Sequence, residues 1–152
     1  MESKFLRSGE AWFDGRVSTL TLVRHHDERG ILLPLELDSL PFPVRRLFTV
    51  VDVPSGTVRG GHGHCRGWQL MICISGAIRL RLRHNRQEVS LMLSDDGPAL
   101  IVGADVWAEQ TYLVANSVLL VACSEVYDPE SYFTEVDSLE IVVPPEHKKE
   151  QL

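Results

Sequence analysis

The chain has 152 residues, of which 44% are hydrophobic and 24% are charged. This length fits one domain, and this composition excludes a disordered, collagenous or coiled-coil chain. Fifteen Lys and Arg residues against twenty-one Asp and Glu residues give a net charge of −6. An acidic chain is a poor partner for nucleic acid, because neutralising phosphates needs a basic surface. A local cluster of arginines can still bind a small anionic ligand.

The cysteines and the lack of long apolar runs determine the expected location. Cys65, Cys73 and Cys123 are an odd number without CxxC spacing, so we expect free thiols and a reducing cytoplasm. The N-terminus lacks the apolar core of a signal peptide, and no apolar run approaches the roughly 20 residues that span a membrane. We therefore expect a soluble cytoplasmic protein with no membrane or nucleic-acid partner.

The N-terminal part offers two arrangements. Residues 1–16 are expected to form an extension before the main domain, which we place at 17–140, and residues 17–24 have the pattern of a strand. This strand either adds to the sheet edge of a neighbouring subunit, with Trp12 and Phe13 packed there, or lies in its own barrel. The first arrangement favours a homodimer.

Short alternating segments dominate the rest of the domain. In residues 44–53, Arg46, Phe48 and Val50 point to one face of the expected strand. Turn residues separate this segment from further strands, which we expect at 69–75, 77–83, 88–93, 99–102 and 117–123. Short, evenly spaced strands with Gly and Pro turns predict a β-sandwich or a barrel.

The C-terminal part carries the one helical signal. Residues 128–139 are expected to form a short helix that Asp128 caps and Pro129 begins. Residues 141–152 form a polar tail.

The segment from Gly56 to Gly76 holds the candidate functional residues. His62 and His64 alternate along an expected strand, so their side chains share one face and lie about 6.6 Å apart. Gln69 begins the next strand and can face the same cavity. The spacing resembles the first motif of the cupins, G-x5-H-x-H-x3,4-E-x6-G. We therefore expect an all-β protein, a cupin jelly-roll barrel with one short C-terminal helix.

The same motif argues against a metal ion. In metal cupins the two His, the Glu and a later His bind the ion, but here Gln69, a poor metal ligand, stands at the Glu position. No His lies near Trp107, where only Glu109 could complete a metal site. We expect no metal and no other cofactor. Two His beside Arg59 in a barrel mouth favour a ligand site, and the alternative is a His pair that only packs.

Further segments make the resemblance more specific. The chain resembles the sugar-nucleotide 3,4-ketoisomerases of the WxcM-like cupin family over most of its length. The matching stretches are 27–32 with Glu36, 41–46, 59–64 with Gln69, 102–103, 106–107 and 124–128 with Tyr132. The resemblance implies a homodimeric cupin that uses no metal. It also implies that the protein moves the carbonyl of dTDP-4-keto-6-deoxyglucose from C4 to C3, in the biosynthesis of unusual deoxysugars.

This chemistry assigns roles to the charged and titratable residues. Removing the C3 proton and returning a proton to C4 needs a base of intermediate pKa, for which His64 or, alternatively, His62 is suited. Arg59 or Arg46 would stabilise the enediolate or bind the pyrophosphate. The alternative for Arg46 is a solvated strand residue.

Gln69, Trp107 and Tyr127 complete the expected substrate site. An indole can cover a base or a sugar face, and either Trp107 or Trp68 could do so. The alternative for Trp107 is ordinary packing at the end of a strand.

Other functions remain open, because the sequence departs from the usual family pattern. Residues 47–49 lack the Tyr that this strand commonly carries, and Cys65 and Ala108 replace a basic residue and a His. The first alternative is a non-catalytic cupin that binds a sugar nucleotide or a partner enzyme. A 3,5-epimerase-like cupin is the second, and it would need one of the three tyrosines as an acid. A metal-dependent cupin oxygenase or isomerase is the third.

Overall fold

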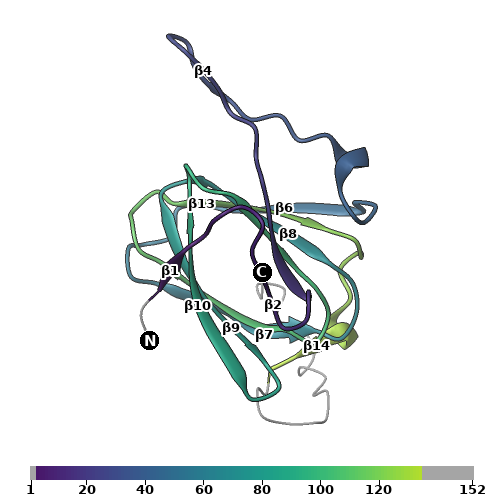
Figure 1. The fold of residues 1–152 in the computed structure, drawn as a ribbon. Helices are drawn as coiled ribbons and strands as arrows, with labels where there is room; N and C mark the ends of the chain where they lie inside the picture. The colour runs from purple at the N-terminus through teal and green to yellow at the C-terminus, as the bar shows by residue number, and fades with distance from the viewer. Residues whose placement is uncertain (1–2, 135–152) are drawn as a thin grey trace.

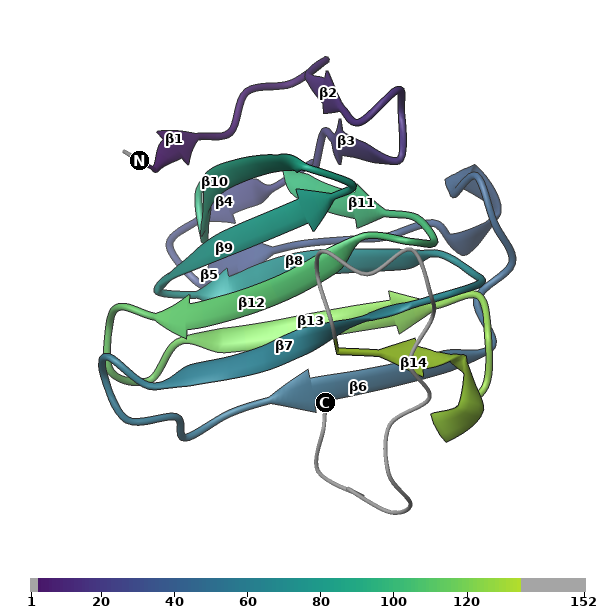
Figure 2. The same ribbon diagram turned by 90° about the horizontal axis from the view of Figure 1, so that it is seen from below.

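The computed structural model describes residues 3–134, which form two six-stranded β-sheets and one two-stranded sheet. Figure 1 looks into the barrel that the two large sheets enclose, and Figure 2 shows it from the side. The first sheet contains, in spatial order, β1 (Lys4–Phe5), β10 (Gln87–Ser94), β9 (Ala77–His84), β12 (Trp107–Tyr112), β7 (Val58–His64) and β14 (Tyr132–Phe133). The second contains β2 (Ala11–Trp12), β3 (Val17–Leu20), β11 (Ala99–Val102), β8 (Gln69–Ser75), β13 (Val118–Cys123) and β6 (Arg46–Val50).

Alternation along the strands builds the core. In β9, Ile78, Leu80 and Leu82 are buried between the sheets, while the arginines between them are exposed. Apolar residues of β8, β10, β11 and β13 complete this interior cluster. A second apolar cluster lies on the outer face of the second sheet, where residues 33–44 contribute to its cover. Burial of both faces explains why β8 reads as a continuous apolar run. The all-β prediction is confirmed.

The predicted C-terminal helix is wrong over the described residues. Its cap forms as expected, because the Asp128 side chain accepts a hydrogen bond from the backbone N–H of Glu130. The turn that follows is a single 3-10 turn, η2 (Pro129–Ser131), and the chain then joins the edge of the first sheet as β14. Pairing with β7 buries both residues of β14. Residues 135–139 of the predicted helix and the tail 141–152 lie outside the described residues. No helix within 3–134 is long and apolar enough to cross a bilayer.

The N-terminal strands belong to the barrel of their own chain. β3 pairs antiparallel with β11, so this strand takes the own-barrel arrangement. The preceding residues also join the sheets, since β1 pairs in parallel with β10 and β2 pairs with β3.

A β-hairpin that the sequence did not predict projects from the barrel. It consists of β4 (His25–Asp27) and β5 (Gly30–Leu32), and all six of its strand residues are exposed. Figure 1 shows the hairpin standing away from the two large sheets. The chain returns to the barrel through the 3-10 turn η1 (Leu37–Ser39).

Candidate active site

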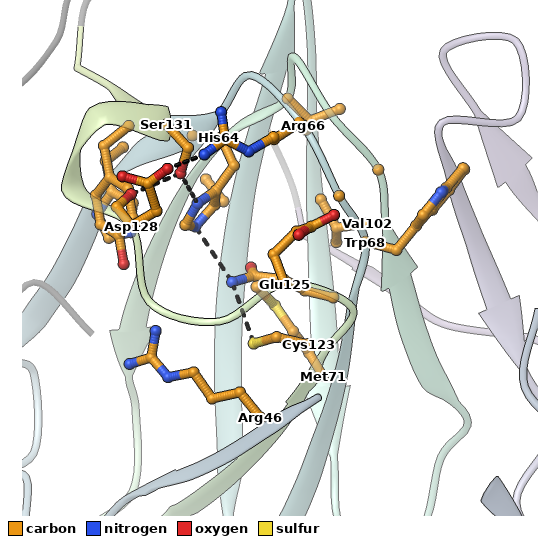
Figure 3. A pocket seen from close by; sticks show the side chains of 18 of the residues that line it. Arg46, His64, Arg66, Trp68, Met71, Val102, Cys123, Glu125, Asp128 and Ser131 are labelled. Carbon is orange, nitrogen blue, oxygen red and sulfur yellow. Dashed lines mark hydrogen bonds and ion pairs between the residues drawn. The ribbon is translucent and has the colours of Figure 1, made fainter. Parts of the chain in front are cut away.

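A pocket opens at one end of the barrel, between the end of β7, the start of β8 and the end of β13 (Figure 3). The lining includes four residues that the sequence analysis selected: Arg46, His62, His64 and Gln69. The prediction that the His pair shares a cavity with Gln69 therefore agrees with the geometry, and the pocket also contains the guanidinium of Arg46.

A β-bulge in β7 turns the His pair inward. Simple alternation would put Arg59 and His62 on opposite faces of the strand. Opposite β12, however, His62 pairs with Ala108 and Gly60 pairs with Glu109. Ala108 and Glu109 are adjacent in sequence, so β7 holds one extra residue between Gly60 and His62. Gly60 has a φ of +80°, a conformation that glycine adopts without strain. The bulge places both His62 and Arg59 on the interior face of the sheet.

His64 lies at the centre of the pocket and is held from several sides. Its Nε2 is 3.2 Å from Nε2 of Gln69, and its Nδ1 is 3.5 Å from Oγ of Ser131. The Gln69 amide can donate only to an unprotonated ring nitrogen, so this geometry corresponds to a neutral imidazole with its proton on Nδ1. Burial, and then the charges of His62 and Arg46, lower the pKa of His64 to about 3. The ring is therefore neutral at pH 7 and can accept a proton.

Tyr132 is the main pocket residue that the sequence analysis did not assign to the site. Its ring stacks on His62 with 4.8 Å between centroids and meets His64 edge-on at 4.3 Å. The side chain is buried, and burial raises the pKa of its hydroxyl. The sequence analysis named Tyr132 in a matching stretch but expected it in a helix, because an isolated two-residue strand leaves no pattern of its own.

Arg46 is the cation that the pocket leaves available. Its guanidinium carbon lies 5.1 Å from the ring centroid of Phe48 and 5.0 Å from that of Tyr127. Among residues 3–134 it forms no ion pair with a carboxylate, whereas the pocket's other arginine, Arg66, pairs with Asp128. A guanidinium fixed between two rings and not neutralised by an acid suits an anion. Arg46 is therefore a pocket residue rather than a solvated strand residue.

The remaining predicted site residues lie outside the lining. Arg59 faces the interior beside Gln110, and its charge acts on buried Tyr112. Tyr127 contacts the pocket through Arg46 and through the ring of Tyr132. Trp107 is buried on the outer face of β12, where the guanidinium of Arg81 lies 5.1 Å from its ring centroid.

The potential metal ligands of the described residues do not gather into one group. No group of three His, Cys, Asp or Glu side chains that could hold an ion occurs within 3–134. Glu109, which could have completed a metal site, forms an ion pair with Arg81 instead, and it pairs with Gly60 rather than with either histidine.

Comparisons with known proteins show which family the chain belongs to. Residues 15–143 match the family model FdtA, described as WxcM-like, C-terminal. A TDP-4-oxo-6-deoxy-alpha-D-glucose-3,4-oxoisomerase from Aneurinibacillus thermoaerophilus is 32% identical over 117 residues, which cover 74% of this chain and 81% of the relative. The sugar 3,4-ketoisomerase QdtA from Thermoanaerobacterium thermosaccharolyticum, solved with TDP, is 31% identical with a TM-score of 0.75, over 80% of this chain and 90% of that one. The WlaRB TDP-quinovose 3,4-ketoisomerase from Campylobacter jejuni is 28% identical with a TM-score of 0.73, over 80% and 94% of the two chains. The family expected from the sequence is thus confirmed, and the chain belongs to the WxcM-like, C-terminal (FdtA) family.

Proposed function

We propose that the protein is an isomerase, a sugar-nucleotide 3,4-ketoisomerase that acts on a dTDP-4-keto-6-deoxyhexose. The observation that carries the proposal is the pairing, in one pocket, of a neutral imidazole with a guanidinium that no carboxylate of residues 3–134 neutralises. The names of the relatives support the reaction and the TDP-linked substrate, because a curated relative and two structural relatives are named as 3,4-isomerases of such sugars or in complex with TDP.

The chemistry follows from these two groups. In the reaction the substrate takes the place of the Gln69 amide at Nε2 of His64. Nε2 then takes the proton from C3, and the electron pair left behind forms the C3–C4 double bond of an enediolate with its negative charge on O4. The guanidinium of Arg46 stabilises that charge. The imidazolium then returns a proton to C4, while the hydroxyl proton moves from O3 to O4. The product has its carbonyl at C3, and no oxidant or reductant is consumed. Buried and neutral, His64 is in the protonation state that the first step requires.

The test is turnover in D2O followed by NMR. We expect dTDP-4-keto-6-deoxyglucose to give a 3-keto product, with deuterium at C4 in proportion to the exchange of the imidazolium proton with solvent. The His64→Asn variant should lose about 100-fold or more of the rate, the usual contribution of a positioned base, and it should still bind dTDP. Cys65→Ser is the control, since Cys65 follows His64 in the chain but does not line the pocket. Wild-type protein that binds dTDP without exchange or product would instead indicate a non-catalytic cupin, and full activity of His64→Asn would disprove its role.

A homodimer is part of the proposal, and the projecting hairpin supports it. Ile31 and Leu32 of β5 are 61% and 65% exposed, on a two-stranded sheet that hydrogen-bonds to neither large sheet and projects from them (Figure 1). Two strands alone are marginally stable in water, and a partner that covers them would stabilise the hairpin. A second copy of the chain is the partner that we propose.

The proposal also includes a cytoplasmic location. All three cysteines are free thiols. Burial raises the pKa of Cys73 to about 12 and also raises that of Cys123, so both stay protonated and unreactive. Free structural thiols fit a reducing compartment.

A further inference from the structure

The rim of the pocket carries an exposed indole that the proposed chemistry does not use. Trp68 lines the pocket together with the histidines, but it is 39% exposed. His64 lies deeper, and its burial contributes most to lowering its pKa to about 3. Figure 3 shows the indole apart from His64 and Ser131, on the other side of Glu125. A ligand whose reacting carbon contacts His64 and whose other end extends past Glu125 would meet Trp68.

The indole is held in place by the backbone around it. The N–H of Trp68 donates to Oγ of Ser124 at 2.8 Å, and the N–H of Ser124 donates to the carbonyl of Trp68 at 2.9 Å. Gly103 lies directly against the ring, because a Cβ at that position would be 2.8 Å from Cζ3 of Trp68. One side of the indole is therefore packed and immobilised, and its remaining surface is available to a ligand at little cost in side-chain entropy.

No other described aromatic side chain combines these properties. Trp107 is buried outside the pocket, and Tyr132 is buried within it. Tyr127 is as exposed as Trp68, but it is not part of the lining and its ring lies against the guanidinium of Arg46. Trp68 is thus the aromatic surface that a planar group at the pocket mouth would meet.

We propose that Trp68 stacks on the nucleobase of the bound sugar nucleotide. This inference rests on the proposed function, since it takes the sugar to lie at His64 and the diphosphate to lie between the two ends. A base stacked on an indole is recognised by its π-face. Trp68 would therefore contribute affinity for the nucleotide without acting on the chemical step.

The test measures binding without turnover. Tryptophan fluorescence of the full chain, excited at a wavelength where the base does not absorb, should be quenched by dTDP. Trp68→Phe should remove the quenching, and Trp12→Phe, a control outside the pocket, should retain it. By calorimetry, Trp68→Ala should raise the Kd for dTDP about 5- to 150-fold, the range given by loss of one stacked base. The Kd for inorganic pyrophosphate should not change.

Each outcome decides a different claim. If wild-type protein binds dTDP and Trp68→Ala binds it equally well, the stacking proposal is wrong while the proposed function stands. If wild-type protein binds no nucleotide, both are wrong. If Trp68→Ala weakens pyrophosphate and dTDP alike, or changes the oligomeric mass, the indole supports the pocket or a subunit interface and does not stack on the base. If Trp68→Ala does not fold, the fluorescence measurement on Trp68→Phe still decides whether the indole contacts the nucleotide.

Discussion

The protonation state of His64 depends on its surroundings rather than on its residue type alone. An exposed histidine titrates near pH 6.5, but burial and the neighbouring charges of His62 and Arg46 favour the neutral ring. In the proposed mechanism the Arg46 guanidinium thus has two effects: it adds to burial in favouring the unprotonated His64, and it faces the negative charge that develops during the reaction.

The pH profile of the reaction should show this coupling. We expect the kcat/KM of wild-type protein to stay level from pH 7.5 down to about pH 5, because His64 protonates only at lower pH. Arg46→Gln removes a charge that lowers the pKa of His64. The fall of kcat/KM on the acidic side should therefore begin at higher pH, and kcat/KM itself should be lower. The control is Arg45→Gln at a neighbouring arginine that lies near Glu125 instead. An acidic limb near pH 6.5 in the wild type, or the same limb in both variants, would contradict this account.

The bulge in β7 is the element that assembles the site. Its geometry depends on Gly60, whose φ is +80° and where a Cβ would lie 2.9 Å from the carbonyl oxygen of Ala108. Gly56, just before the same strand, has a similar φ of +84° but open space around it. A substitution at Gly56 therefore tests backbone strain alone, whereas a substitution at Gly60 tests strain together with a close backbone contact.

Substituting each glycine by alanine should separate the two effects. Gly56→Ala should lower the free energy of unfolding by about 1–2 kcal/mol, the cost of a left-handed conformation for an L-residue, with activity nearly unchanged. Gly60→Ala adds a contact with backbone, so it should destabilise more. Because it displaces His62 and His64, it should also reduce kcat/KM about 10- to 100-fold. Urea denaturation and the exchange assay measure the two quantities. Equal behaviour of the two variants would show that the bulge does not position the histidines.

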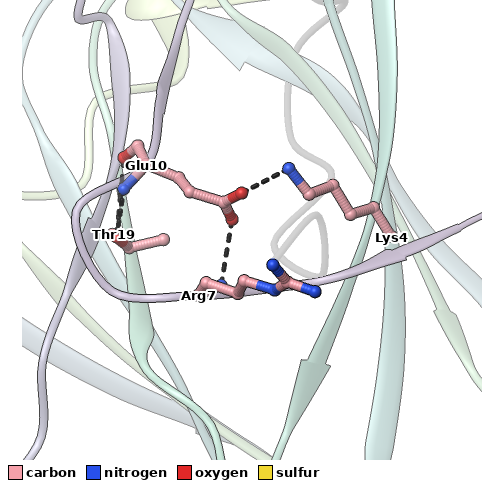
Figure 4. A network of polar contacts seen from close by, with 4 residues as sticks. All are labelled: Lys4, Arg7, Glu10 and Thr19. Atoms are coloured by element: carbon pink, nitrogen blue, oxygen red, sulfur yellow. Dashed lines mark hydrogen bonds and ion pairs between the residues drawn. The ribbon is translucent and has the colours of Figure 1, made fainter.

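At the scale of the whole molecule, the N-terminal segment ties the two sheets together. β1 joins one sheet and β2 the other, and Glu10 lies between them in sequence. Figure 4 shows its carboxylate accepting hydrogen bonds from the Lys4 ammonium and the Arg7 N–H, while its own N–H donates to Oγ1 of Thr19 at 3.1 Å. With this segment in its own barrel, the projecting hairpin becomes the stronger candidate for contact with a second subunit.

The dimer can be tested at the hairpin. Ile31→Asp combined with Leu32→Asp should convert a dimer into a monomer, measured by light scattering coupled to size exclusion, because charge replaces the apolar surface that the partner would bury. Val114→Asp, at another exposed apolar residue in the connection between β12 and β13, is the control and should remain dimeric. A wild-type monomer, or a hairpin variant that remains dimeric, would refute the proposed interface.

The amino-acid sequence by itself determined the class of fold, the family and the central pair of histidines. Alternation of apolar and polar residues is a local property, so the strands of β6, β8, β9, β10, β11 and β13 were found where the sequence placed them. The spacing of His62, His64 and Gln69 is equally local, because a strand and a short turn translate it directly into a shared cavity.

Only the tertiary structure decided which other residues join the pocket. The bulge at Gly60 exists because β7 pairs with β12, and Tyr132 reaches the histidines because β14 pairs with the free edge of β7. The setting of Arg46 likewise depends on Tyr127, from a distant part of the chain. These contacts depend on pairing between segments far apart in sequence, which no local pattern records. For that reason Trp107 was expected in the site although it packs outside, whereas Tyr132 was expected in a helix although it lies at the centre of the pocket.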